Sequence, residues 1–156
     1  LSFDRPEDRP NTLLWLTTQT AVGYLILIPI IIYFYKIGYE YLLLIPILVN
    51  GIGDGLAEPV GVRFGRLKYK TYALFSKLKY ERTVEGSACV FFTSVIVIIF
   101  FQSGFTSSEF ICLLIVFPIV MTLAEAFAPH TWDTPFLFLF GYLTLYIVKI
   151  MPFVAH

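Results

Sequence analysis

The sequence contains few of the residues that build most soluble active sites. Its only histidines are His130 and His156, so there is little support for a histidine metal centre or a Ser-His-Asp triad. We interpret His130 as an ordinary interface residue. The two cysteines, Cys89 and Cys112, fall inside apolar stretches and are expected to fill space rather than to form a disulfide.

The glycine-rich motifs of soluble nucleotide-binding folds are also missing. The segment GIGDG at 51–55 lacks the GxGxxG spacing of a dinucleotide fingerprint and the GK[ST] ending of a P-loop. The chain shows no internal repeat and no low-complexity tract. A nucleotide site in this protein therefore requires a different architecture.

Charge is scarce. Of the 156 residues, 14% are charged and 58% are hydrophobic, and the mean hydropathy is +0.79. These values lie outside the usual range of soluble domains. Phenylalanine and tyrosine, with 16 and 10 copies, are abundant, as is typical of lipid-facing surfaces and interfacial belts. We therefore predict an integral membrane protein with an all-α fold, a polytopic helix bundle.

The apolar stretches set the expected spans: Leu13–Tyr35, Tyr41 to about Gly53, Cys89–Phe101, Phe110–Phe127 and Phe136–Val148. Crossing the hydrocarbon takes about 20 helical residues, so the shorter stretches need their flanks, and we predict about five transmembrane helices. One transmembrane domain, 13–156, would follow a polar tail, 1–12, and contain one long polar loop at about 58–85. The chain begins at Leu1 rather than Met, which leaves room for a processed segment or further spans before it.

Positive charge is concentrated on one predicted membrane face. With five spans, the tail, the 57–84 loop and the 128–135 link share a face that carries nine of the eleven Lys and Arg residues. The positive-inside bias makes this face cytoplasmic, stromal or matrix-like, and does not specify an organelle.

The loop begins with a stretch of small and acidic residues. Four small residues recur at every fourth position: Gly53, Ala57, Gly61 and Gly65. If 53–65 is helical, this stripe lets a ligand or a neighbouring helix approach closely, and helix packing is the commoner use. Asp54 and Glu58 lie one turn apart on the next stripe and can hold a divalent cation. Pro59 predicts a break or kink at Glu58–Pro59, of the kind that lines cavities in membrane proteins.

Further charges gather around this stretch. Arg63, Arg66 and Lys70, at spacings of three and four, predict a basic face for phosphate oxygens or anionic lipid head groups, although such residues often only set topology. Four more basic residues lie nearby: Lys68, Lys77, Lys79 and Arg82. Glu85 and Ser87 start the next predicted helix, where a carboxylate also satisfies the helix dipole.

Two later carboxylates extend the pattern. Glu125 lies near the end of a predicted span, and Asp133 lies in the following link. A carboxylate near membrane depth is costly and by default indicates a site. The predicted topology brings these residues to the same face as Asp54 and Arg82. Carboxylates with Arg and Lys at a lipid interface suit a nucleoside triphosphate, Mg²⁺ and a lipid substrate.

These motifs together resemble the CTP-dependent lipid and polyprenol kinases (dolichol kinase, phytol kinase and the CTP-using diacylglycerol kinase) and, more distantly, phosphatidate cytidylyltransferase. The family pattern of Asp, Ala, Gly and Gly occurs as Asp54, Ala57, Gly61 and Gly65, and the second motif as RTVEG at 82–86. The third motif is similar to Glu125 with Asp133-Thr134-Pro135. The resemblance covers roughly residues 45–140.

The resemblance implies CTP as phosphate donor, Mg²⁺, and a lipid alcohol (polyprenol, phytol, dolichol or diacylglycerol) as acceptor. By position, the implied catalytic residues are Asp54, Glu85, Glu125 and Asp133, and the implied metal ligands are Asp54, Glu58 and Glu85. The implied nucleotide-binding residues are Gly53, Ala57, Gly61, Arg63, Gly65, Arg66, Arg82 and Gly86. Membrane lipids and subunits of a membrane complex are expected partners; nucleic acid is not.

The chain departs from the family at two positions and in having fewer predicted spans than many members. Arg82 stands where the family commonly has Lys, and Thr134 replaces the usual Asn. Two alternatives therefore stay open beside the kinase. One is a lipid-phosphate cytidylyltransferase, and the other is a divergent, non-catalytic transmembrane subunit of a larger complex.

Overall fold

The computed structural model describes residues 12–73, 76–129 and 132–150, and most of them are helical. The main helices are α1 (Thr12–Lys36), α2 (Leu44–Leu48), α3 (Gly55–Phe64), α4 (Val84–Phe100), α5 (Ser107–Phe127) and α6 (Asp133–Ile150). Short 3₁₀ turns, η2 (Glu40–Leu43) and η4 (Gln102–Gly104), and a π-helical turn, η3 (Val49–Asp54), connect them. The predicted tail up to residue 11, His130 and His156 lie outside the described residues.

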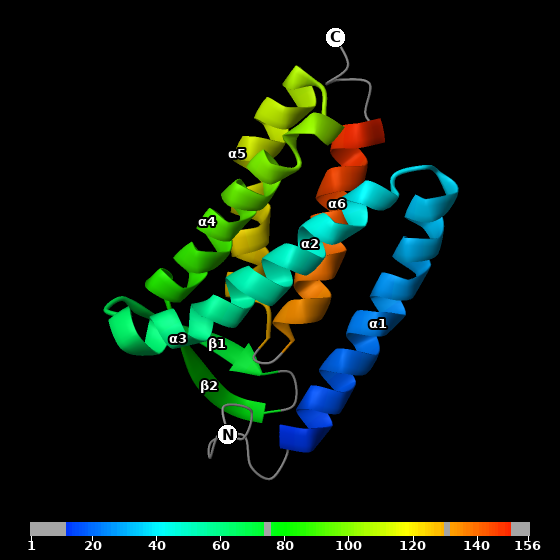
Figure 1. Ribbon diagram of the computed structural model, residues 1–156. Coiled ribbons are helices and arrows are strands. Elements are labelled where there is room, and N and C mark those ends of the chain that lie inside the picture. Colours follow the sequence, from blue (N-terminus) through cyan, green and yellow to red (C-terminus); the bar gives the residue numbers. More distant parts are fainter. Residues whose placement is uncertain (1–11, 74–75, 130–131, 151–156) are drawn as a thin grey trace.

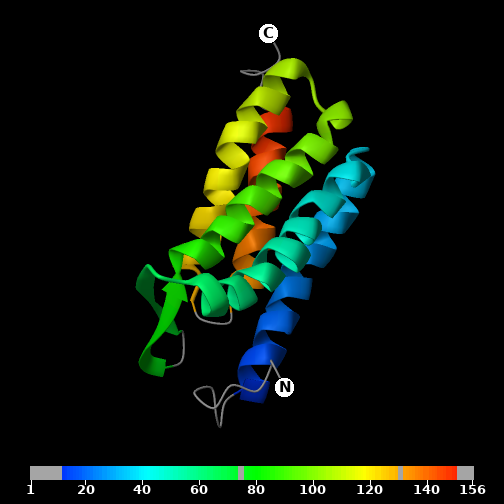
Figure 2. The ribbon, with the colours of Figure 1, turned by 60° about the vertical axis from the view of Figure 1, so that its left-hand side comes forward.

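The helices form one bundle (Figure 1). α4, α5 and α6 pack side by side, α1 packs on α6, and the segment from η2 to α3 packs on α4 (Figures 1 and 2). The interior is filled by large apolar side chains from these elements other than α3, including Leu42, Ile45, Val49, Val90, Ile98, Phe117, Leu137 and Leu145. Gly38, at φ 76°, adopts the left-handed conformation that ends α1 and lets the chain reverse toward η2.

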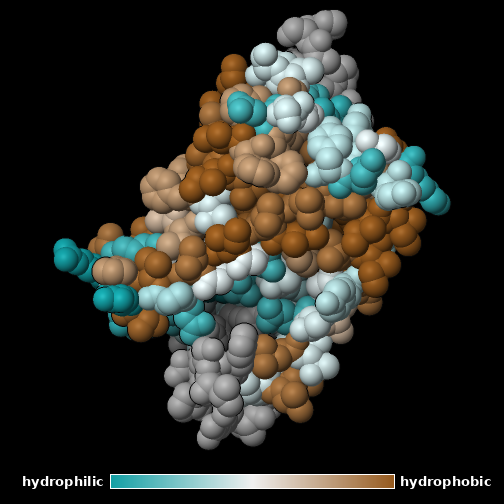
Figure 3. All heavy atoms as spheres, in the orientation of Figure 1, coloured by the Kyte–Doolittle hydropathy of each residue, from teal (hydrophilic) through white to brown (hydrophobic). Residues whose placement is uncertain are grey.

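Three helical segments are long and apolar enough to cross a membrane: Thr12–Lys36, Glu40–Phe64 and Ser107–Phe127. α4 is apolar but shorter. Many large apolar side chains remain exposed along α1 and α4, such as Leu25 at 72% and Phe100 at 79%. Figure 3 shows hydrophobic residues covering the middle of the bundle, with hydrophilic residues gathered toward its two ends. This pattern supports a mostly helical membrane protein, while the count of five spans stays a prediction.

The segment 58–85, predicted as one polar loop, is structured, and it adds a two-stranded sheet to a chain that is mostly helical, as predicted. α3 occupies its first part, and an antiparallel hairpin of β1 (Lys68–Ala73) and β2 (Ser76–Thr83) fills most of the rest. The strands alternate in exposure: Lys68, Lys70 and Tyr72 face outward, whereas Thr71 is buried. This period of two, with Tyr and Thr between lysines, favours a half-buried strand, and the high charge of the segment obscured it.

Of the break or kink predicted at Glu58–Pro59, the break is wrong, because α3 continues through Pro59, and the kink stays a prediction. Pro59 is the fifth residue of α3, so the bond that its missing N–H would make to the carbonyl of Gly55 is the only one lost. The departure from α-helical geometry lies one turn earlier, in the π-helical turn η3. Such turns are frequent at functional sites.

Candidate functional site

The centre of the candidate site is the side chain of Arg82, near the end of β2. Its Nη1 donates to the main-chain oxygen and to Oε1 of Glu125, both at 2.5 Å, and its Nη2 donates to Oδ2 of Asp133 at 3.1 Å. Glu125 lies in the last turn of α5, and Asp133 is the first residue of α6. The three side chains are only 12%, 5% and 17% exposed. One guanidinium thus joins the ends of two apolar helices.

The charge state of Arg82 follows from these neighbours. Burial works against the charged guanidinium, but the carboxylates of Asp133 and Glu125 outweigh it and raise the pKa of Arg82 above its usual value. The guanidinium therefore keeps its positive charge at every physiological pH.

Two hydroxyl groups complete the site. Ser87 Oγ, in the first turn of α4, donates to Oε2 of Glu125 at 2.7 Å. Because that uses the hydrogen of Ser87, Tyr69 OH donates in turn to Ser87 Oγ, also at 2.7 Å. Burial raises the pKa of Tyr69. We call Tyr69, Arg82, Ser87, Glu125 and Asp133 the Arg82 cluster.

The hairpin delivers two members of the Arg82 cluster from the same face. Tyr69 of β1 and Arg82 of β2 are directly paired in the strand register. Directly paired residues project on the same side of a sheet, so both side chains reach the ends of the helices together. The cap of α4 fixes the turn that follows, because Thr83 Oγ1 accepts the N–H of Gly86 at 3.1 Å.

Asp54 lies next to the Arg82 cluster. Its carboxylate interacts electrostatically with Asp133, Arg82 and Glu125, and with Glu58 one turn later. Within the described residues, no hydrogen-bond donor reaches it. Since a carboxylate has about four acceptor sites, Asp54 retains the capacity to bind a cation or a donor group.

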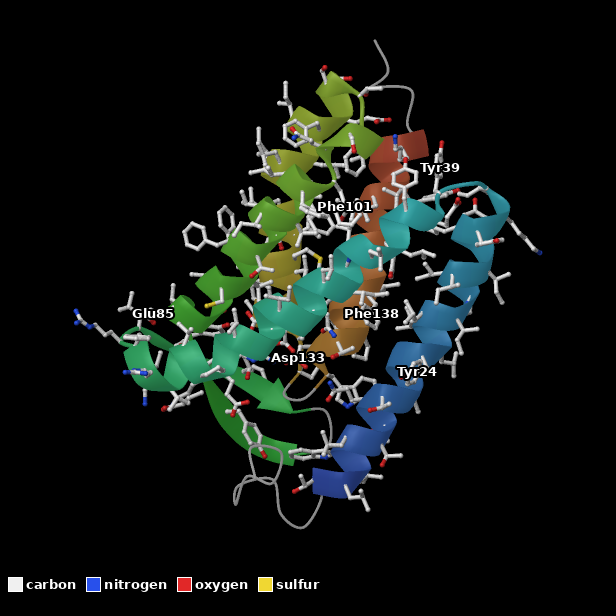
Figure 4. All side chains as sticks on the ribbon, viewed as in Figure 1. Tyr24, Tyr39, Glu85, Phe101, Asp133 and Phe138 are labelled. Atoms are coloured by element: carbon white, nitrogen blue, oxygen red, sulfur yellow. The ribbon has the colours of Figure 1, made fainter. Side chains whose placement is uncertain are left out.

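Glu85 does not join this group. Its carboxylate accepts the main-chain N–H groups of Arg66, at 2.9 Å, and Leu67, at 3.3 Å. Figure 4 shows Glu85 on the outer side, beside α3, and Asp133 at the inner end of α6. Glu85 therefore fastens the segment between α3 and β1 to the start of α4.

The implied metal set is consequently not assembled as a set. No three His, Cys, Asp or Glu side chains converge on a possible cation position in the part of the chain that the structure describes. Magnesium, however, commonly takes one or two carboxylates together with substrate phosphates and water. A magnesium ion held by Asp54 and Glu58 jointly with a nucleotide therefore stays a prediction.

The small-residue stripe faces α4. A Cβ on Gly53 would lie 3.2 Å from Cα of Val90, and a Cβ on Gly86 would lie 2.7 Å from the main-chain oxygen of Ala57. A Cβ on Gly61 would lie 2.6 Å from Oγ1 of Thr83. The structure thus gives the stripe the role of close helix packing, and nucleotide contact by Gly53, Ala57, Gly61, Gly65 and Gly86 stays a prediction.

The basic residues do not form the predicted helical face. α3 ends at Phe64, so Arg66 lies in the connection and Lys70 in β1. Arg63 and Arg66 instead line an open hollow together with Phe64, Gly65 and Glu85. The Arg63 guanidinium lies 5.5 Å from the centre of the Phe64 ring. This hollow is a second basic region beside the Arg82 cluster.

Sequence reasoning missed two polar residues at this end of the bundle. Tyr69 was hidden by the unrecognised strand. Asn50 Oδ1 is buried and has no hydrogen-bond partner among the described residues. Asn50 ends the apolar run YLLLIPILV, and a polar side chain at that depth was the available signal.

Comparison with protein-family models, with curated proteins and with solved structures found no match to this chain. The two residues that differ from the resembled motifs, Arg82 and Thr134, both form side-chain hydrogen bonds in the structure. Arg82 uses separate nitrogens for Glu125 and Asp133, which the single ammonium of Lys cannot imitate. Thr134 Oγ1 accepts from Nε2 of Gln19 at 3.0 Å and so connects α6 to α1.

Proposed function

We propose that this chain is a CTP-dependent kinase that phosphorylates a membrane-embedded lipid alcohol, of the polyprenol, phytol, dolichol or diacylglycerol class. The observation that carries the proposal is the buried guanidinium of Arg82 between Glu125 and Asp133, with Asp54 beside them, at one end of an apolar bundle. A buried cation among carboxylates at the depth of lipid head groups serves phosphate chemistry on a lipid.

The proposed reaction is a direct phosphoryl transfer. The hydroxyl oxygen of the lipid bonds to the γ-phosphorus of CTP, and the bond from that phosphorus to the bridging oxygen breaks. CDP leaves with the electron pair of that bond, and the hydroxyl proton is released to water. Such transfer depends mainly on positioning and charge neutralisation. Magnesium, when bound, neutralises phosphate charge.

The residues divide this work by position. Asp54, with Glu58, holds the magnesium ion. Arg82 offers N–H groups and a fixed charge to the phosphates. Glu125, whose two carboxylate oxygens already bind Arg82 and Ser87, keeps that guanidinium in place.

The hollow beside the site supplies further positive charge. Arg63 and Arg66 line it, and they are available to the phosphates of CTP arriving from the polar side. In this proposal the hairpin faces the cytoplasm, stroma or matrix, and α4 and α6 cross the membrane with the three longer segments.

One observation favours a different class of function. Both carboxylate oxygens of Glu125 accept a hydrogen bond from the protein, and a network of this kind can simply hold helix ends together. A non-catalytic subunit of a membrane complex would need no more than that.

A cytidylyltransferase would use the same end of the bundle, but in its reaction the lipid phosphate would attack the α-phosphorus of CTP.

The decisive experiment uses the purified chain in lipid nanodiscs with Mg²⁺ and CTP labelled at either the α- or the γ-phosphate. Geranylgeraniol, phytol, dolichol and diacylglycerol serve as acceptors. We expect label from γ-labelled CTP alone to enter one of these lipids. Transfer of the α-label to a lipid phosphate would show that the chain is a cytidylyltransferase and not a kinase. No transfer to any acceptor would favour a non-catalytic subunit of a membrane complex.

Matched variants locate the chemistry. Asp54→Asn should lower turnover on the order of 100-fold through loss of the metal ligand. The control is Glu81→Gln, whose carboxylate forms an exposed pair with Lys68 at 2.9 Å on the outside of the hairpin, and its turnover should match the wild type. Equal activity in Asp54→Asn would contradict the placement of magnesium.

A further inference from the structure

Asn50, at this end of the bundle, has a side-chain oxygen without a hydrogen-bond partner in the described part of the chain. Asn50 lies in the π-helical turn η3, between the apolar helix α2 and α3. Its Oδ1 is buried and receives no hydrogen bond from any residue in the described ranges. Burial of an amide oxygen without a donor destabilises a fold, and the shape-matched leucine would avoid that cost. The side chain is therefore better explained by a ligand than by folding.

The position of Asn50 along the helix defines which ligand it meets. Asn50, Asp54 and Glu58 follow one another at intervals of four, on neighbouring turns of one face. Asn50 is the member nearest to α2, whose sequence LIPIL is entirely apolar, and Glu58 is nearest to the hairpin. Hydrophilic residues gather below α2 in Figure 3, where Figure 4 places Asp133. Asn50 thus stands where the apolar part of the bundle meets its polar end.

We propose that Asn50 Oδ1 accepts the hydrogen bond of the hydroxyl group of the lipid acceptor and so selects a neutral alcohol as substrate. This inference rests on the proposed kinase function. A lipid whose chain lies along α2 presents its hydroxyl to Asn50, one turn short of Asp54. CTP phosphates, held from the side of Arg82, then lie beyond the hydroxyl. Asn50 binds and orients the acceptor and takes no proton.

The chemistry of the amide oxygen explains the selectivity. A carbonyl oxygen is an acceptor, so it pairs with an O–H and is repelled by the oxygens of a phosphate monoester. The site therefore favours an alcohol over a lipid that is already phosphorylated. A site built to hydrogen-bond a hydroxyl group rejects analogues that lack it, because its own polar atom would stay unpaired.

The test compares Asn50→Leu with wild type in nanodiscs, using geranylgeraniol as acceptor. We expect KM for the alcohol to rise about tenfold, which is the loss of one hydrogen bond, with KM for CTP and the half-saturating Mg²⁺ concentration unchanged. The matched control is Ser94→Ala. Ser94 is a buried hydroxyl of α4 whose Oγ is already satisfied by the carbonyl of Val90 at 2.7 Å, so KM should not change.

A second measurement separates this inference from the kinase proposal. A photoactivatable long-chain alcohol, added without nucleotide, should label wild type and Ser94→Ala equally and Asn50→Leu about tenfold less. If this labelling pattern is seen but the wild type transfers no phosphate, the kinase proposal is contradicted, whereas the proposal that Asn50 binds an alcohol stands. Thermal unfolding in the same nanodiscs reports folding, and Asn50→Thr serves as the test variant if Asn50→Leu does not fold.

Three results would overturn the inference. The first is an unchanged KM for the alcohol with unchanged labelling, which would make Asn50 a purely structural residue. The second is a raised Mg²⁺ requirement with an unchanged KM for the alcohol, which would make Asn50 a metal ligand. The third is equal labelling of wild type and Asn50→Leu by the photoactivatable alcohol and by the corresponding hydrocarbon without a hydroxyl.

Discussion

Arg82 Nη1 donates to both the side-chain Oε1 and the main-chain oxygen of Glu125, which lies 43 positions further along the chain. The contact joins the hairpin to the last turn of α5. Because Nη2 of the same guanidinium holds Asp133 at the start of α6, one residue fixes both ends of the link between the two helices. Removing it would disturb the site and the fold together.

Arg82→Lys tests whether the two terminal nitrogens of the guanidinium are both required to hold Glu125 and Asp133. A lysine ammonium keeps the charge but cannot bridge Glu125 and Asp133 with two nitrogens in fixed geometry. We expect a loss of about 1–3 kcal/mol in the free energy of unfolding. Arg82→Met, which leaves two carboxylates without their cation, should cost about 3–5 kcal/mol. Denaturant unfolding in detergent micelles measures both.

The control for this pair is Lys68→Met, at an exposed ion pair on the same hairpin. Its unfolding should match the wild type, since exposed pairs contribute little. If Arg82→Met unfolded at the wild-type denaturant concentration, the Arg82 cluster would not hold the helix ends.

Gly86→Ala tests the close approach of α3 and α4. The new Cβ would lie 2.7 Å from the main-chain oxygen of Ala57, and a main-chain atom cannot move aside without moving its helix. We expect a destabilisation of about 1–3 kcal/mol, measured by thermal unfolding. Gly55→Ala is the matched control on α3, because nothing lies within 4 Å of its Cβ position.

The control should change in the opposite direction. Alanine in an open helical position stabilises a helix by about 0.5–1 kcal/mol relative to glycine. Two glycine-to-alanine changes on contacting helices should therefore have opposite signs. Stabilisation by both would mean that α3 and α4 do not pack as the structure shows.

Another ion pair lies at the opposite end of the bundle. Lys149 Nζ donates to Oε2 of Glu109 at 2.8 Å, and each side chain is 11% exposed. Lys149 also lies 5.8 Å from the centre of the Tyr39 ring and 5.3 Å from that of Phe105. Figure 4 shows Tyr39 at the end of the molecule opposite Asp133. The pair ties α6 to the start of α5 and to the turn before α2.

Lys149→Met should lower the free energy of unfolding by about 3 kcal/mol, because it leaves the buried Glu109 without its cation. KM for CTP should stay at the wild-type value, since the pair lies far from the Arg82 cluster. Lys36→Met, at an exposed position on α1, is the control and should change neither quantity. A raised KM for CTP in Lys149→Met, with stability unchanged, would mean that CTP binds at the Lys149 end of the bundle and not at the Arg82 cluster.

The predicted topology puts the hairpin and the turn after α4 on opposite sides of the membrane. Single cysteines at Lys70 and Gln102, both exposed, report this when Cys89 and Cys112 are replaced by alanine. In sealed vesicles, a membrane-impermeant maleimide should label one of the two positions and leave the other for labelling after lysis. Labelling of both before lysis would contradict a transmembrane α4.

The apolar runs alone determined most of the helices. Long stretches without charge can satisfy their main-chain groups in lipid only as helices, so α1, α5 and the course of α6 follow from composition and length. The alternation of Tyr and Thr with lysine in β1 is also a signal present in the local sequence. The strand was not predicted because the high charge of the segment indicated a polar loop. The convergence of Arg82, Glu125 and Asp133 was anticipated from the count of crossings and the position of the charges.

The direction of each side chain was decided by tertiary packing. The small-residue stripe determines which face of α3 packs on α4, because only the face that carries Gly and Ala can approach the main chain of α4. That orientation places Asp54 beside Arg82 and leaves Asn50 Oδ1 without a hydrogen-bond donor among the described residues. Glu85 was drawn away by the N–H groups of Arg66 and Leu67, 19 and 18 positions before it. Sequence spacing shows which residues share a helix face, but only the packed neighbours determine what that face contacts.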